Sequence, residues 1–161
     1  MDAKTLAKEI QIRPITEHDE ALVNSFFDAM SPASSGFFNR RDYNRRTTLR
    51  QCRKSEKDKL YWIATLEECM AGLVFFWDWN TGIPELGIAV RDDLQGKHLG
   101  RTLMEYALRR AKECGKGGFC LTTHIANVRA QVLYESFGFV CIGQTKNGTE
   151  LFYMLRFPTE Q

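Results

Sequence analysis

Residues 95–101 form a polar turn that joins an extended segment to an amphipathic one. The first main-chain amides of a helix have no partner inside the helix, and the helix dipole adds partial positive charge there. Gly96 and Gly100 have no Cβ, so a ligand can approach the main chain closely. Lys97 and Arg101 add positive charge nearby. The turn therefore indicates a phosphate site, although glycines used only for tight packing would give the same pattern.

The sequence of this turn separates it from the common nucleotide-binding motifs. The chain has no G-x-x-x-x-G-K-[ST] motif for a nucleoside triphosphate and no G-x-G-x-x-G motif for a dinucleotide. Residues 95–100 resemble instead the [QR]-x-x-G-x-[GA] loop with which the GNAT superfamily of N-acetyltransferases binds acetyl-CoA. The departure is His98, where the family usually has glycine. A left-handed backbone there would cost histidine on the order of 1 kcal/mol, and a helical one would be tolerated.

A second segment, residues 127–139, carries the resemblance independently. It matches the family signature N-x-x-A-x-x-L-Y-x-x-x-G-F and follows a predicted strand, as in that family. Asn127, Ala130 and Tyr134 share one helical face because of their spacing. A polar group, a small residue and a phenol on one face suit a narrow channel for a thioester tail. The resemblance covers residues 60–157 well and the N-terminal part loosely.

The resemblance implies direct transfer of an acetyl group from acetyl-CoA, as co-substrate, to a primary amine of a small molecule or peptide. It implies no metal and no covalent cysteine. Glu85 is then the candidate general base and Tyr134 the candidate general acid toward the leaving sulfur. Glu85 could instead orient the acceptor or stand exposed at a strand start, and Tyr134 could be a buried phenol that serves stability. The implied cofactor-binding residues are Ile88, Ala89, Val90, Gln95, Gly96, Lys97, His98, Leu99, Gly100, Arg101, Asn127, Ala130 and Tyr134.

The acceptor amine sets the need for a base. A lysine-like amine with a pKa of about 10.4 costs roughly 4.6 kcal/mol to deprotonate at pH 7, whereas an α-amine with a pKa near 8 costs about 1 kcal/mol. Aromatic residues could line an apolar acceptor pocket, although most are better explained as core: Phe26, Phe27, Phe37, Phe38, Tyr43, Phe75, Trp77 and Trp79. An arginine run could favour an acceptor carboxylate or CoA phosphates, or simply be a solvated helix face: Arg40, Arg41, Arg45, Arg46, Arg50 and Arg53.

The periodicity of the sequence predicts the elements that position these residues. Strands are expected at 10–15, 60–66, 70–79, 85–90 and 119–123, with a closing hairpin of 139–144 and 150–157 that turns at Lys146-Asn147-Gly148; helices are expected at 17–30, 41–52, 99–111 and 127–137, and a turn-rich loop at 31–36. We therefore expect an α+β fold in one domain, residues 1–161. Its centre is a mixed, mostly antiparallel twisted sheet of about seven strands flanked by about four helices.

Composition limits the other classes. The formal net charge is +2, which argues against a dedicated nucleic-acid binder that uses the arginine run. The chain has no apolar run near the roughly 18–20 residues of a membrane span and no signal-peptide core, so we expect a cytoplasmic protein. Its five cysteines are widely spaced, and Cys120 with His124 supplies too few ligands for a metal. A non-catalytic acyl-CoA-binding or regulatory module is the main alternative, favoured by His98 and opposed by Tyr134 and Asn127. The sequence is compatible with a homodimer and does not decide the oligomeric state.

Overall fold

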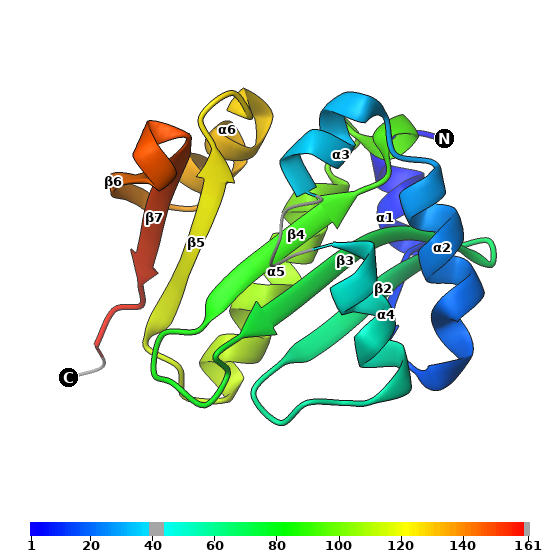
Figure 1. Ribbon diagram of the computed structural model, residues 1–161, viewed down its shortest axis with the longest axis horizontal. Coiled ribbons are helices and arrows are strands. Elements are labelled where there is room, and N and C mark those ends of the chain that lie inside the picture. Colours follow the sequence, from blue (N-terminus) through cyan, green and yellow to red (C-terminus); the bar gives the residue numbers. More distant parts are fainter. Residues whose placement is uncertain (39–43, 160–161) are drawn as a thin grey trace.

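The computed structural model describes residues 1–38 and 44–159. In chain order the elements are α1 (Ala3–Glu9), β1 (Gln11–Pro14), η1 (Glu17–Asp19), α2 (Glu20–Asp28), α3 (Pro32–Phe38), α4 (Arg45–Arg53), β2 (Leu60–Leu66), β3 (Cys69–Trp77), β4 (Glu85–Val90), η2 (Asp92–Leu94), α5 (Leu99–Glu113), β5 (Gly118–His124), α6 (Val128–Ser136), β6 (Val140–Thr145), η3 (Lys146–Gly148) and β7 (Glu150–Arg156). The strands form one seven-stranded sheet in the order β1-β2-β3-β4-β5-β7-β6 (Figure 1). Every neighbouring pair is antiparallel except β4 with β5. The predicted fold class is confirmed.

Helices cover both faces of the first half of the sheet. On one face, α2 and α4 pack over β2 and β3; on the other, α1, α5 and α6 share a larger core with the sheet. The helix α5 buries Leu99, Leu103, Ala107 and Ala111, whose four-residue spacing keeps them on one face. Because β3 is covered on both sides, residues 70–76 are all buried. None of the described helices has the length and apolar character needed to cross a membrane.

The strands β4 and β5 diverge soon after they meet. Their only register pair is Glu85 with Cys120, whereas β4 pairs with β3 along its whole length. In Figure 1 the two strands spread apart toward α3 and α6. The edge of β4 that faces β5 therefore carries main-chain groups of residues 86–90 that are not bonded to a neighbouring strand.

The N-terminal part differs from the prediction in two helices. The segment 31–36, expected to be a loop, lies mostly in α3: Ser31 caps the helix by accepting from the Ser34 amide, and Pro32 occupies the first helical position. The short helix α1, whose N-cap is Asp2, was not expected. The helix predicted at 41–52 begins at Arg45 after its Asn44 cap. Residues 41–43 of that prediction lie outside the described residues.

Candidate functional site

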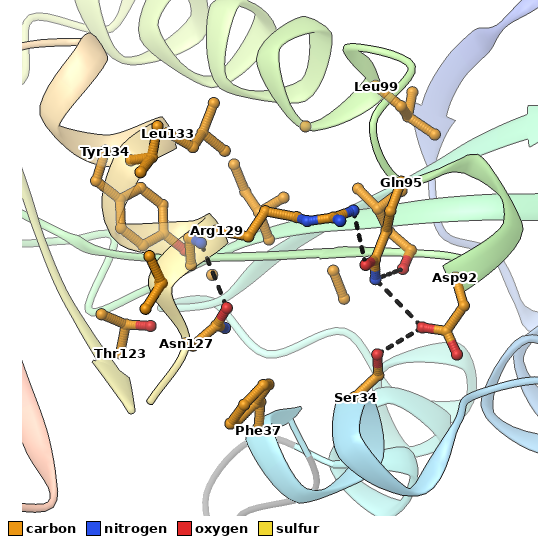
Figure 2. Close-up of a pocket in the computed structure, with 18 of the residues that line it drawn as sticks. Ser34, Phe37, Asp92, Gln95, Leu99, Thr123, Asn127, Arg129, Leu133 and Tyr134 are labelled. Atoms are coloured by element: carbon orange, nitrogen blue, oxygen red, sulfur yellow. Dashed lines mark hydrogen bonds between the residues drawn. The ribbon is translucent and has the colours of Figure 1, made fainter. Parts of the chain in front are cut away.

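A cavity of about 990 Å³ opens where β4 and β5 separate, and α3, α6 and the start of α5 complete its wall (Figure 2). Residues 86–90 of β4 lie along it and present the unbonded strand edge. Gly87 is required here because a Cβ at this position would come within 2.0–2.5 Å of ring atoms of Phe75. The far end of the Phe75 ring thus packs against Gly87, and Phe75 contributes to the cavity wall.

The turn before α5 forms one end of the cavity. Gly96 has φ +78° and His98 has φ +63°, so His98 adopts the left-handed conformation that was one of the two alternatives left open. The first helical bond joins the Thr102 amide to the His98 carbonyl at 3.1 Å. In the described part of the chain, the amides of residues 96–101 donate to no main-chain carbonyl. These donors and the positive end of the helix dipole suit a diphosphate.

The start of α6 lies across the cavity from this turn. Asn127 is its N-cap, and its Oδ1 accepts a hydrogen bond of 3.3 Å from the Ala130 amide. Asn127, which is predicted to bind the cofactor, therefore has a structural task as well: its oxygen is already engaged, and its side-chain NH₂ is the group left to face a ligand. Asn127 and Ala130 both line the cavity.

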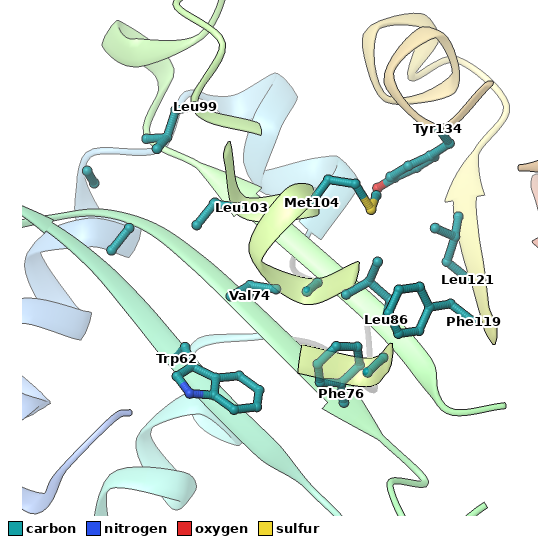
Figure 3. Close-up of a cluster of buried hydrophobic side chains, with 14 of the residues drawn as sticks. Trp62, Val74, Phe76, Leu86, Leu99, Leu103, Met104, Phe119, Leu121 and Tyr134 are labelled. Atoms are coloured by element: carbon teal, nitrogen blue, oxygen red, sulfur yellow. The ribbon is translucent and has the colours of Figure 1, made fainter. Parts of the chain in front are cut away.

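Tyr134 lines the same cavity from the next turn of α6, and its ring is only 7% exposed. The ring packs near Phe139 and Tyr153 and belongs to the larger core that it shares with α5 (Figure 3). Among the described residues its hydroxyl has no hydrogen-bond partner, and burial raises the pKa of Tyr134 to about 12. The phenol therefore stays protonated at neutral pH and is a donor without an acceptor.

The cavity brings together all the predicted cofactor-binding residues except Lys97. Glu85 is also absent from its wall; it lies where β4 and β5 meet, in register with Cys120. Burial, and next the charge of Glu85, raise the pKa of the Cys120 thiol to about 11. Glu85 lies three positions before Ile88, which is roughly 10 Å along the strand at the usual rise. Glu85 thus stands at the end of β4 that is farther from the turn before α5.

A chain of hydrogen bonds, which no sequence motif predicted, crosses the cavity (Figure 2). The Arg129 Nη1 donates to Gln95 Oε1 at 3.1 Å, and Gln95 Nε2 donates to Asp92 Oδ1 at 3.2 Å. Ser34 of α3 donates to the same Asp92 oxygen at 2.5 Å. Arg129 and Ser34 are separated by most of the chain, and no local pattern links them. The bonds of Arg129 to Gln95 and of Ser34 to Asp92 thus depend on tertiary structure, while the bond between Gln95 and Asp92 is local.

The predicted acceptor residues divide between core and cavity. Phe37 and Phe75 line the cavity, while Phe26, Phe27, Trp77 and Trp79 belong to or pack against the two cores. The Phe38 side chain and the predicted residues Arg40, Arg41 and Tyr43 lie outside the described residues.

The described arginines of the predicted run lie on α4, and two of them are paired with acidic residues of α2. Arg45 contacts Asp28 at 2.7 Å and Arg53 contacts Glu20 at 2.5 Å. These ion pairs hold two arginines of the run against a neighbouring helix, whereas a ligand-binding or solvated helix face was expected. Within the described ranges, no group of three His, Cys, Asp or Glu side chains converges to hold a metal ion.

Comparisons with known proteins agree with this geometry. The model of the acetyltransferase (GNAT) family matches residues 23–139. A domain from Methanocaldococcus jannaschii superposes with a TM-score of 0.75 at 27% identity, covering 92% of this chain and 98% of the other. The PaiA N-acetyltransferase of Thermoplasma acidophilum, solved in complex with coenzyme A, gives 0.75 at 19% identity over 92% and 99%. The ribosomal-protein-S18-alanine N-acetyltransferase of Escherichia coli gives 0.72 at 20% over 94% and 96%. No curated protein matches the sequence.

Proposed function

The chain belongs to the GNAT family of acetyltransferases, and from this premise we propose that it transfers the acetyl group of acetyl-CoA directly to a primary amine of a small molecule or peptide. The cavity between β4 and β5 carries this proposal, because the turn before α5 with its open amides, residues 86–90 of β4 and Tyr134 all contribute to its lining. Residues 1–161 are proposed to form one domain, since β6 and β7 follow the matched segment and complete the same sheet.

The residues present fit coenzyme A. Amides of residues 96–101 would hold its diphosphate, with Arg101 and Arg129 adding charge. The open edge of β4 at residues 86–90 would bond the amides of the pantetheine arm as an added strand does. The side-chain NH₂ of Asn127 would donate to the same arm. When bound, acetyl-CoA supplies the acetyl group as a thioester.

Tyr134 would donate its hydrogen bond to the sulfur that leaves in the reaction. A thiol like that of cysteine has a pKa of about 8.5, well below the value of about 12 for the buried Tyr134. Complete proton transfer is therefore unfavourable at the start, but a hydrogen bond that strengthens as charge develops on sulfur lowers the barrier. An amide of β4 would serve the thioester oxygen in the same way. Glu85 would act as general base.

Binding and thiol-release assays test this function. We expect acetyl-CoA to raise the melting temperature and a panel of primary amines to release free thiol. Tyr134→Phe should lower turnover by about 100-fold, the lower end of the usual acid–base contribution, while the acetyl-CoA Kd stays within about twofold. Tyr106→Phe is the matched control, because Tyr106 packs against Trp62 away from the cavity. Binding without thiol release would instead indicate the non-catalytic module.

The pH profile gives a second check on these roles. Since burial disfavours the phenolate and raises the pKa of Tyr134 to about 12, loss of its proton should not reduce turnover below about pH 11, one unit under that value. An alkaline decline near pH 10 that disappears in Tyr134→Phe would contradict the raised pKa of Tyr134, whereas a profile unchanged by Tyr134→Phe apart from its height would agree with it. Glu85→Gln should reduce turnover most at low pH and with amines of high pKa, where a base has most to do. An equal loss at every pH would limit Glu85 to positioning.

A further inference from the structure

The helix α3 forms the wall of the cavity on the side away from α6, and it has little apolar support. It contributes Ala33, Ser34 and Phe37 to the wall. Within the described side chains, residues 32–37 belong to neither hydrophobic core. A helix of seven residues is too short to be stable by itself in water. Contacts with its surroundings must therefore fix its position.

Asp92 provides those contacts from the segment that joins β4 to the phosphate-binding turn. Its Oδ2 accepts from the Ser31 amide and its Oδ1 from the Ser34 hydroxyl, each at 2.5 Å. Burial tends to raise the pKa of Asp92, but the hydrogen bonds from Ser34 and Ser31 outweigh it and hold the pKa below the usual value. The carboxylate is therefore charged at neutral pH. Hydrogen bonds to a charged acceptor are roughly twice as strong as neutral ones.

The same carboxylate is joined to the phosphate-binding turn. Gln95, the first residue of that turn, donates to Asp92 Oδ1 and accepts from Arg129 of α6. A diphosphate held by the turn would attract the Arg129 guanidinium and change the partners of Gln95. Since Gln95 and Ser34 share one oxygen of Asp92, the change reaches α3 through a single side chain (Figure 2).

We propose that Asp92 is a positioning residue that fastens α3 to the phosphate-binding turn, so that binding of coenzyme A orders the acceptor side of the cavity. This inference rests on the proposed function, since it takes coenzyme A as the ligand of the turn. The acceptor would then meet a completed wall only after the cofactor has bound. Asp92 need not touch either substrate for this.

Hydrogen–deuterium exchange of the full chain, with and without coenzyme A, tests the proposal. In the unchanged protein, coenzyme A should slow exchange in residues 96–101 and also in residues 31–38. In Asp92→Asn, exchange of 31–38 should be about tenfold faster and should no longer respond to coenzyme A, while 96–101 respond as before. Asp93→Asn is the matched control: it removes the same charge from the next residue, which is exposed and bonded to Arg91. Ser34→Ala, which removes the hydroxyl donor, should change exchange in the same direction as Asp92→Asn.

The outcomes separate this inference from the proposed function. A segment 31–38 in Asp92→Asn that still responds to coenzyme A like the unchanged protein would overturn the inference and leave the function intact. So would an unchanged protein in which only 96–101 respond. If the exchange of residues 96–101 never responds to coenzyme A, the cofactor does not bind at the turn, and the proposed function and the coupling fail together. A difference between Asp92→Asn and Asp93→Asn in the ligand-free exchange of residues 31–38 would then support only the attachment of α3 by Asp92.

Discussion

The helices α5 and α6 begin at the same cavity but begin in different ways. Asn127 caps α6 with its own side chain, which accepts from the Ala130 amide. At α5 the N-cap position holds His98 in a left-handed conformation, and it provides no side-chain hydrogen bond to the helix. A capped helix start satisfies its own donors, whereas an uncapped one leaves them for a ligand or water. In the proposed function, the uncapped start of α5 holds the diphosphate and the capped helix α6 holds Tyr134 in place.

The largest effect on acetyl-CoA affinity should come from crowding the uncapped start of α5. A Cβ at Gly100 would lie 3.2 Å from Leu133 Cδ2 and 4.0 Å from Val90 Cγ2, so Gly100→Val must push α5 away from α6 or crowd the amides. We expect the acetyl-CoA Kd, measured by titration calorimetry, to rise about 30-fold, equivalent to roughly 2 kcal/mol. Gly143→Val is the control, because a Cβ there meets nothing within 4 Å. Equal affinities in the two variants would place the phosphates elsewhere.

A smaller effect should come from removing the cap of α6. Asn127→Ala should lower the free energy of unfolding by about 1 kcal/mol, the usual value for an N-cap. Asn127→Asp keeps the accepting oxygen, so the stability should survive while the lost NH₂ donor weakens acetyl-CoA binding by several-fold. Urea titration and calorimetry on the two variants separate the tasks. If Asn127→Asp binds acetyl-CoA as well as the unchanged protein, Asn127 is only a cap.

The smallest effect should follow from His98→Gly. Glycine adopts φ +63° without strain, but it also adds freedom to the unfolded chain. We expect a net gain in the free energy of unfolding below about 1 kcal/mol, with acetyl-CoA affinity unchanged or slightly higher. His98→Val should lower the free energy of unfolding, because a β-branched residue is more strained than histidine at a positive φ. A loss of stability in His98→Gly, read from urea midpoints, would show that the imidazole makes a contact worth more than its strain.

The sequence was informative where function and local structure depend on the same residues. The strands at 60–66 and 85–90 are confirmed at their predicted bounds, because bulky apolar runs between turn residues leave few alternatives. The start of α5 and the start of α6 follow from motifs that lie within a few residues. For His98 the sequence defined two backbone conformations, and only the folded turn shows which one is adopted.

The sequence was uninformative where distant segments stabilise one another. Pro32 and the serines around it are typical of a loop, yet α3 forms there because Asp92, far along the chain, binds its first turn. Lys97 and Glu85 fall in the right segments but are not among the residues that line the cavity, and adjacent residues of a turn or strand face different ways. Spacing alone did not reveal the contact between Arg129 and Gln95.

Because β4 and β5 share a single register pair, the sheet consists of two parts, β1–β4 and β5–β7, that are weakly joined to each other. Hydrogen bonds between neighbouring strands normally hold a sheet rigid, and they are few between β4 and β5. The helices α5 and α6, which share a core with the sheet, must therefore hold its two parts together. A pantetheine arm lying along β4 would bridge the gap between β4 and β5 and so join the two parts of the sheet. Nucleotide fragments that lack the arm should then strengthen the turn before α5 without stiffening the molecule as a whole.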